Sequence, residues 1–333
     1  MRFAAEVLPS TLVMILGGAF LAMFLAWVAV ASIVERRLNL GKPVIPSLPS
    51  RPRLVPWEWR SVLVIIATMM LAMNVVAFAL WVAEGHRTPR VNGLVQAPPR
   101  VDAKVSFSPS EQLLISAFTN LIVLSLGPMI LRWTSNATRA DLGFVPRRLA
   151  RDVGIGCVAF LLVTPVVMLA NFAAQVVFKV HEHELEKMLR GDPKEGSFLI
   201  LAIISAVVLA PVCEEFVFRA VLQGWLRRVY LGRLAERAML EGFQGDLEPT
   251  PRLTAHKSWP PMARLMPIVI TSALFGIVHF EQMPAPIPIF LLSLALGALY
   301  EWTESLVPSI VLHALFNAFN TIALLMMIRE KAV

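Results

Sequence analysis

Long apolar stretches alternate with short polar ones along most of this chain. Eight of these stretches are candidates for helices that cross the roughly 30 Å of a bilayer's hydrocarbon. They are Leu8–Val34, Ser61–Ala83, Gln112–Leu131, Gly154–Phe178, Phe198–Trp225, Leu265–Phe280, Ile287–Tyr300 and Pro308–Ile328. The seventh is short and lies among prolines, so it either tilts or dips into the membrane and returns. The pattern predicts an all-α fold, a polytopic transmembrane helix bundle of about eight spans.

Composition supports a membrane protein with several spans. Of the 333 residues 57% are hydrophobic and 16% are charged, whereas soluble domains have about 25% charged residues. The net charge of +7 would also suit a nucleic-acid partner, but in a chain of this class it indicates basic loops, and no nucleic-acid partner is expected.

The basic residues are distributed unevenly between alternate loops. The loops 35–60, 132–152 and 226–264 hold 6, 5 and 7 Lys and Arg residues, while 84–111 and 179–196 hold 4 each. The positive-inside rule therefore places the first set in the cytoplasm and the N-terminus outside. We expect a multi-pass protein of the cell membrane.

Ionisable side chains within the predicted spans are few and lie in the C-terminal half. Glu214 lies 13 residues before the cytoplasmic base Arg227, and His279 lies 15 residues after Arg264. At 1.5 Å per residue, both lie about 20 Å from the same membrane face. By similar counting, His313 and Asn317 reach about the same depth. Charged groups at this depth are costly and usually functional.

Local spacing adds detail to this set. Glu215 and Arg219 are four residues apart and can pair within one helix, which leaves Glu214 to face elsewhere. Such a pair can also be a structural clamp, and a membrane histidine or asparagine can simply bond a neighbouring helix. The convergence of all of them favours a water-containing site, where a carboxylate and a histidine activate water to hydrolyse an amide or ester bond.

Three motifs resemble those of a known family. Glu214-Glu215-x-x-x-Arg219 resembles the EExxxR motif of the CPBP family, the CAAX protease and bacteriocin-processing intramembrane endopeptidases, which include the type II CAAX prenyl endopeptidases. The segment 275–279 (FGIVH) resembles the family's FxxxH motif, and 313–317 (HALFN) its HxxxN motif. The resemblance covers about residues 140–325. It predicts two regions, an N-terminal helix pair with proline-rich loops in residues 1–110 and the protease domain in 111–333.

The resemblance implies a peptidase that acts on a membrane-associated protein or peptide, lipidated in some relatives, from a site open to the cytoplasm. It implies that Glu214 is the general base, assisted by His279. His313 and Asn317 would form the oxyanion site, and Glu215 with Arg219 would support them. The family is often called metalloprotease, so Zn²⁺ held by Glu214, His279 and His313 is the alternative to a metal-free glutamate mechanism, which we favour. The other open alternative is a non-catalytic scaffold or immunity protein that retains the motifs.

Overall fold

The computed structural model describes residues 2–43, 53–85, 90–91, 94–95, 107–178, 196–232 and 261–330. Apart from one small antiparallel ladder, in which Arg90 pairs with Val95 and Val91 with Leu94, the elements in these ranges are helices. In chain order the elements are α1 (Arg2–Asn39), α2 (Trp59–Gly85), β1 (Arg90–Val91), β2 (Leu94–Val95), α3 (Pro109–Ser135), η1 (Pro146–Arg148), α4 (Leu149–Phe178), α6 (Gly196–Ile204), η2 (Ser205–Leu209), α7 (Ala210–Glu215), η3 (Phe216–Gln223), α9 (Pro261–Ile277), η4 (Phe280–Gln282), α10 (Pro286–Thr303) and α11 (Val307–Glu330). The all-α prediction is confirmed, while most of the proline-rich loops lie outside the described residues.

Seven helical segments in the described part of the chain are long and apolar enough to cross a membrane. They are 17–39, 59–83, 110–135, 149–178, 200–232, 286–303 and 307–326. The chain is therefore a multi-pass membrane protein. The seventh predicted stretch, though short, is among them as α10.

One predicted span, Leu265–Phe280, is corrected by the structure. It lies in α9, whose 17 residues are about 25 Å long and whose apolar part, Arg264–Ile277, is shorter than the seven helices above. The helix ends two residues before His279, and a 3-10 turn leads directly into α10.

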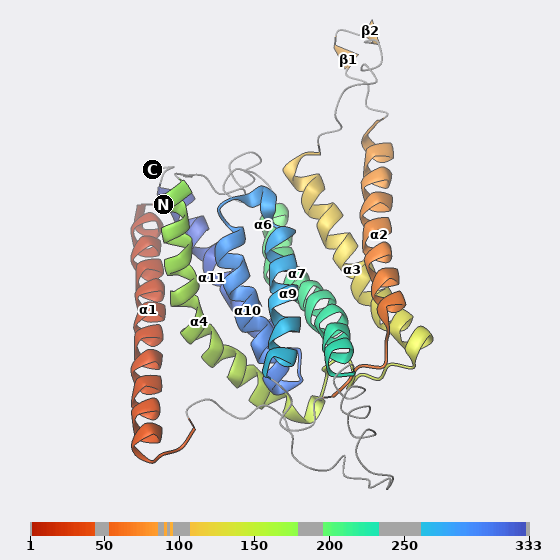
Figure 1. The fold of residues 1–333 in the computed structure, drawn as a ribbon. Coiled ribbons are helices and arrows are strands. Elements are labelled where there is room, and N and C mark those ends of the chain that lie inside the picture. The colour runs from red at the N-terminus through yellow and green to blue at the C-terminus, as the bar shows by residue number, and fades with distance from the viewer. Residues whose placement is uncertain are drawn as a thin grey trace, which may run out of the picture.

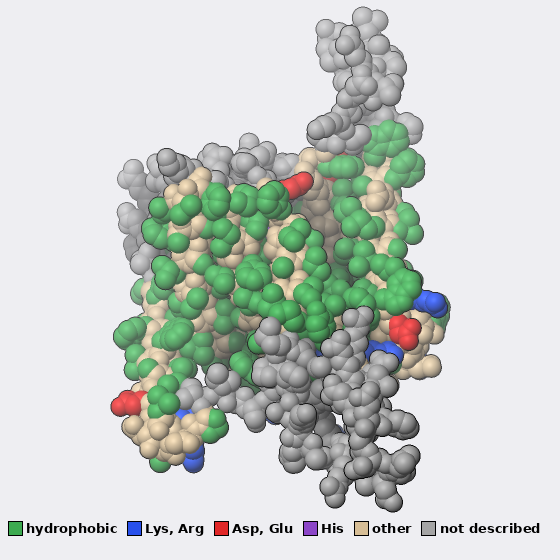
Figure 2. All heavy atoms as spheres, in the orientation of Figure 1, with side chains coloured by type: hydrophobic (Ala, Val, Ile, Leu, Met, Phe, Trp, Pro, Cys, Tyr) green, Lys and Arg blue, Asp and Glu red, His purple; other side chains and the backbone are tan. Residues whose placement is uncertain are grey.

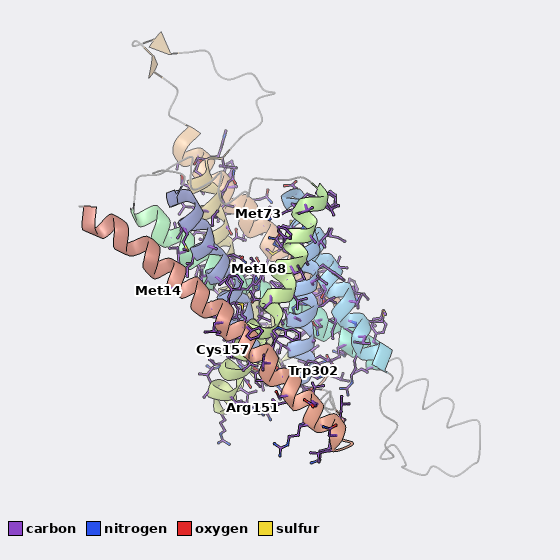
Figure 3. All side chains as sticks on the ribbon, turned by 90° about the vertical axis from the view of Figure 1, so that its left-hand side faces the viewer. Met14, Met73, Arg151, Cys157, Met168 and Trp302 are labelled. Atoms are coloured by element: carbon purple, nitrogen blue, oxygen red, sulfur yellow. The ribbon has the colours of Figure 1, made fainter. Side chains whose placement is uncertain are left out.

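The helices stand side by side in one bundle (Figure 1). The helix α1 lies at one edge, α2 and α3 at the opposite edge, and the segments from α6 to α11 fill the space between them. Seen from the side of α1, that helix crosses in front of the bundle (Figure 3). Hydrophobic side chains cover most of the described surface in Figure 2, and the charged atoms lie near the ends of the helices. This distribution suits a surface that faces lipid.

Buried apolar side chains form two clusters. The larger joins the segment before α2, the helices α2 and α3, the helix around Phe216, and the end of α10 at Tyr300. The smaller joins α4, α10 and α11 around Leu296 and Leu312. The helix 196–232, which carries Glu214 and Glu215, passes through the larger cluster, so its orientation is set by packing on several sides.

The loop before α4 holds the start of α11 in place. Thr138 and Asp141 bond each other's backbone N–H groups, which closes a tight turn. Gly143 follows with φ +79°, a left-handed conformation that favours glycine. Its carbonyl accepts from the N–H of Leu306, 3.1 Å away. This contact fixes the entry of the helix that carries His313 and Asn317.

Candidate functional site

The helix from Gly196 to Gly232 is not a regular α-helix. Two stretches, Ser205–Leu209 and Phe216–Gln223, have π-helical hydrogen bonding, and the short α7 between them ends with Glu214 and Glu215. At the first stretch the N–H of Ala210 donates to the carbonyl of Ser205, five residues back. Single π turns within α-helices are frequent at functional sites. Here they flank the two glutamates on both sides.

The imidazole of His313 lies between the two adjacent carboxylates. Its Nδ1 is 3.0 Å from Glu215 Oε1, and its Nε2 is 3.7 Å from Glu214 Oε2. The side chains of Glu215 and His313 are 0% and 5% exposed, whereas that of Glu214 is 30% exposed. An ionised carboxylate only accepts hydrogen bonds, so Nδ1 carries a proton and Nε2 faces the more open glutamate.

Arg219 holds the other oxygen of Glu215. Its Nε donates to Glu215 Oε2 over 3.2 Å, and both side chains are 0% exposed, as the four-residue spacing predicts for a pair within one helix. The two terminal nitrogens of Arg219 donate to Thr271 Oγ1 of α9 and Ser293 Oγ of α10. The guanidinium also lies 5.7 Å from the centre of the Phe275 ring. A buried charge thus has a partner on every polar side.

His279 lies at the border of the site. Its Nδ1 is 2.7 Å from the carbonyl of Phe275, one turn earlier, so Nδ1 carries the proton in the neutral ring and Nε2 is left to accept. The imidazole is half-buried and interacts electrostatically with Glu214. The centre of the Phe275 ring lies 5.0 Å from that of His279 and 6.0 Å from that of His313, so this ring is a neighbour of both histidines.

Asn317 bonds the first π-helical stretch. Its Nδ2 donates to the carbonyl of Ala206 over 2.9 Å. In the i→i+5 pattern this carbonyl would accept from residue 211, but Pro211 has no N–H. The asparagine amide supplies the missing donor. Asn317 therefore links α11 to the helix of the glutamates, which leaves its second amide N–H and its carbonyl for other partners.

The structure also places groups that the motifs do not include. Trp57, which is fully buried, donates through Nε1 to the carbonyl of Val221 in the second π-helical stretch. Thr271 and Ser293 hold Arg219 as described above, and Gln223 donates to the carbonyl of Gly297. One signal was available in the sequence: the positions 215, 219, 223 and 227 are polar at four-residue spacing within an apolar segment.

The predicted zinc ligands do not form a three-ligand group as placed. Among the residues that the structure describes, no group of three or more His, Cys, Asp or Glu side chains is arranged to hold a metal ion. His313 turns both ring nitrogens toward carboxylates, and Nδ1 of His279 faces the carbonyl of Phe275.

Comparison with protein families gives one match. Residues 196–319 match the family model described as type II CAAX prenyl endopeptidase, Rce1-like. Searches of curated proteins and of solved structures give no match. The matched segment contains Glu214, Glu215, Arg219, His279, His313 and Asn317. The match supports protease activity in a membrane, and it confirms the resemblance that the motifs predict: over residues 196–319 this chain is similar to the Rce1-like type II CAAX prenyl endopeptidases.

Proposed function

We propose that this protein is an intramembrane endopeptidase that hydrolyses a peptide bond of a membrane-associated protein or peptide with a water activated by Glu214. One observation carries the proposal: an imidazole, His313, is held between a fully buried glutamate and a neighbouring glutamate that is open to small molecules. A purely structural clamp would need only the buried pair. The second, partly exposed carboxylate is suited to bind and deprotonate water.

The separation of Glu214 and His313 suits a shared water. At 3.7 Å, Oε2 and Nε2 are too far apart for a strong direct hydrogen bond. A water oxygen can lie about 2.8 Å from both Glu214 Oε2 and His313 Nε2 and hydrogen-bond to both atoms. Glu214 then takes a proton from this water as its oxygen attacks the carbonyl carbon. The same proton goes to the amide nitrogen when the C–N bond breaks.

The remaining residues act on the carbonyl oxygen and on the glutamates. His313 lies between two carboxylates and acts as an imidazolium, which carries a proton on both nitrogens. Its Nδ1–H is held by Glu215, and its Nε2–H faces the reaction and stabilises the oxyanion. The second amide N–H of Asn317 is the other candidate donor. His279 assists Glu214 from the edge of the site, and Arg219 holds Glu215 in its orientation. The substrate enters from the cytoplasmic side of the cell membrane.

The test is cleavage of a panel of labelled peptides by purified protein in detergent, with and without a lipid group near the cleavage site. We expect Glu214→Gln to lower kcat by about 10²- to 10⁴-fold, the usual contribution of a general base, while the melting temperature stays close to that of the wild type. Glu58→Gln is a suitable control, because Glu58 is an exposed glutamate whose ion pair with Arg228 lies at the surface.

Elemental analysis of the same samples separates the two mechanisms. Full activity without a stoichiometric metal supports the metal-free reaction. Stoichiometric zinc, removed by a chelator together with activity, would assign water activation to the metal. Equal kcat in wild type and Glu214→Gln would exclude the role given to this residue. A protein that folds, binds the peptides and cleaves none of them would favour the scaffold alternative.

A further inference from the structure

We propose that Ser293, together with Thr271, is a positioning residue for the hydrolytic site: the two hydroxyls fix Arg219, and Arg219 fixes the Glu215–His313 pair. This inference rests on the proposed function for its kinetic consequence only. Neither residue belongs to the three motifs, and both side chains come from helices other than the one that carries the glutamates.

The hydrogen bonds of Arg219 determine where its plane lies. Nη2 donates to Ser293 Oγ over 2.6 Å, and Nη1 donates to Thr271 Oγ1 over 3.3 Å. The hydroxyl of Thr271 donates its hydrogen to the carbonyl of Pro267 or Ile268. A lone pair of its oxygen is therefore free to accept from the arginine. A guanidinium is a rigid planar fork. Fixing both terminal nitrogens therefore also fixes the direction of Nε, which donates to Glu215.

The register between two helices brings Ser293 to this place. Three side chains of the helix 196–232 bond α10 one after another. Arg219 bonds Ser293, Gln223 bonds the carbonyl of Gly297, and Arg227 bonds Glu301. Each bond joins residues 74 positions apart. In a regular α-helix, residues 215 and 227 would point about 120° apart. A π-helix has more residues per turn than an α-helix, so four residues of Phe216–Gln223 make slightly less than a full turn. This reduces the angle between the directions of residues 215 and 227. All these polar side chains consequently face α10.

Gly297 leaves the room that this arrangement needs. A Cβ at this position would lie 3.0 Å from Gln223 Oε1 and 3.3 Å from Arg219 Nη1. The same Cβ would lie 2.9 Å from a methyl group of Ile268. An alanine here would therefore press on the guanidinium without removing any of its hydrogen-bond partners.

A movement of Arg219 would change the position of the His313 imidazole through Glu215. Glu215 has one oxygen on Arg219 and the other on Nδ1 of His313, and all three side chains are buried. The carboxylate cannot follow the arginine without changing its bond to the imidazole. Ser293 thus acts on the reaction through two intermediates and does not touch the reacting atoms.

The experiment compares Ser293→Ala with Ser272→Ala in the purified full-length protein. Ser272 is also fully buried, and its hydroxyl has no hydrogen-bond partner among the described residues. The two variants therefore lose the same group at the same burial, but only one loses a contact with Arg219. Thr271→Val and Thr271→Ser form a second pair, in which only the first variant lacks the hydroxyl. Gly297→Ala tests displacement of the guanidinium with all its bonding groups present.

Two readouts are needed. We expect kcat to fall about 10-fold in Ser293→Ala and Thr271→Val, with KM unchanged, as when a hydrogen bond to a charged group is lost. Ser272→Ala and Thr271→Ser should stay within about twofold of wild type. The ¹⁵N resonances of the His313 ring, assigned by their loss in His313→Gln, should shift in Ser293→Ala, Thr271→Val and Gly297→Ala.

The ring resonances separate failure of this inference from failure of the proposed function. If they do not move in Ser293→Ala, or move equally in Ser272→Ala, the positioning role is wrong whatever the kinetics show. If they move as expected while Glu214→Gln retains full activity, the positioning of the Glu215–His313 pair stands and the proposed function fails.

Discussion

In α2 and α3, polar side chains turn back onto their own helices. Thr68, Asn74 and Ser125 each donate to the carbonyl four residues earlier, over 2.7–2.8 Å. In the C-terminal segments, polar side chains bond across the bundle, as Arg219 does to Ser293 and Asn317 to Ala206. The residue types overlap, but the partners differ.

The difference shows how a membrane bundle fixes a site. A bond to the i−4 carbonyl satisfies a hydroxyl or an amide and leaves the helix free to rotate against its neighbours. A bond to another helix restricts that rotation. Interhelical bonds in membranes are worth only about 0.6 kcal/mol on average, so their contribution here is mainly to orientation. The regions are not wholly distinct, because Ser61 of α2 also bonds Thr134 of α3.

Removal of the arginine should break the C-terminal arrangement most strongly. In Arg219→Met, Glu215 keeps a buried charge without its guanidinium partner, because both side chains are fully buried. Loss of one partner of such a pair costs about 3–5 kcal/mol. We expect a clear drop in the melting temperature in detergent together with loss of cleavage. A melting temperature equal to that of the wild type would show that the pair does not organise the bundle.

The second comparison uses one substitution at two bonds between separate elements, one buried and one exposed. Trp57→Phe removes the donor to Val221 from a fully buried site, while Trp27→Phe removes an exposed donor from α1 to Leu162 of α4. A buried carbonyl left without its donor costs about 1–3 kcal/mol. We expect the free energy of unfolding, measured by thermal unfolding, to fall by this amount in Trp57→Phe and by less in Trp27→Phe. The reverse order would show that burial does not decide how much a bond between separate elements stabilises the bundle.

The two asparagines give a finer test. Asn317→Leu removes the amide that donates to Ala206 beside Pro211. We expect a loss of about 0.6 kcal/mol in the free energy of unfolding, and not more than about 1.7 kcal/mol, the range known for interhelical bonds in membranes. Reversible unfolding in mixed micelles measures it. Stability unchanged from the wild type would indicate that the π-helical stretch keeps its shape without this donor.

The smallest effect is expected for Asn74→Leu, the same change in α2. Asn74 is exposed on the bundle surface and donates only to Met70 of its own helix. Leucine in that place suits lipid better than an amide, so stability should change by less than about 0.5 kcal/mol. A loss as large as that of Asn317→Leu would mean that own-helix bonds also hold the bundle together.

Much of the fold follows from the apolar pattern, since the lengths of the stretches at 59–83 and 307–326 set their helices. The Glu215–Arg219 pair is also predicted by spacing alone. The π-helical stretches are not, because they depend on partners far away in the chain: Asn317 and Trp57 supply donors to Ala206 and Val221. The residue Ser293 gives no sequence signal, since a serine in an apolar helix usually bonds its own backbone.

The position of His279 shows a second limit of prediction from the sequence. Counting residues from Arg264 predicts its depth, but not that α9 stops at Ile277 and leaves the imidazole on a turn. The catalytic roles given to Glu214, His279, His313 and Asn317 stay predictions. So does the division of the chain at residue 110, although Val55, Trp57, Val62 and Ile65 pack in the same core cluster as Phe216.

The π-helical turns also bear on how this protein tolerates changes of length. A π turn corresponds to an α-helix with one residue added, and each residue of an α-helix accounts for about 100° of rotation. Deletion of a single apolar residue between 216 and 223 would therefore return this stretch to α-helical bonding and leave Arg227 on nearly the same face as Glu215, since eleven steps of 100° bring the helix within about 20° of its starting direction. Homologues that are one residue shorter in this stretch are therefore expected to keep the polar positions of α10 and to have a regular α-helix here.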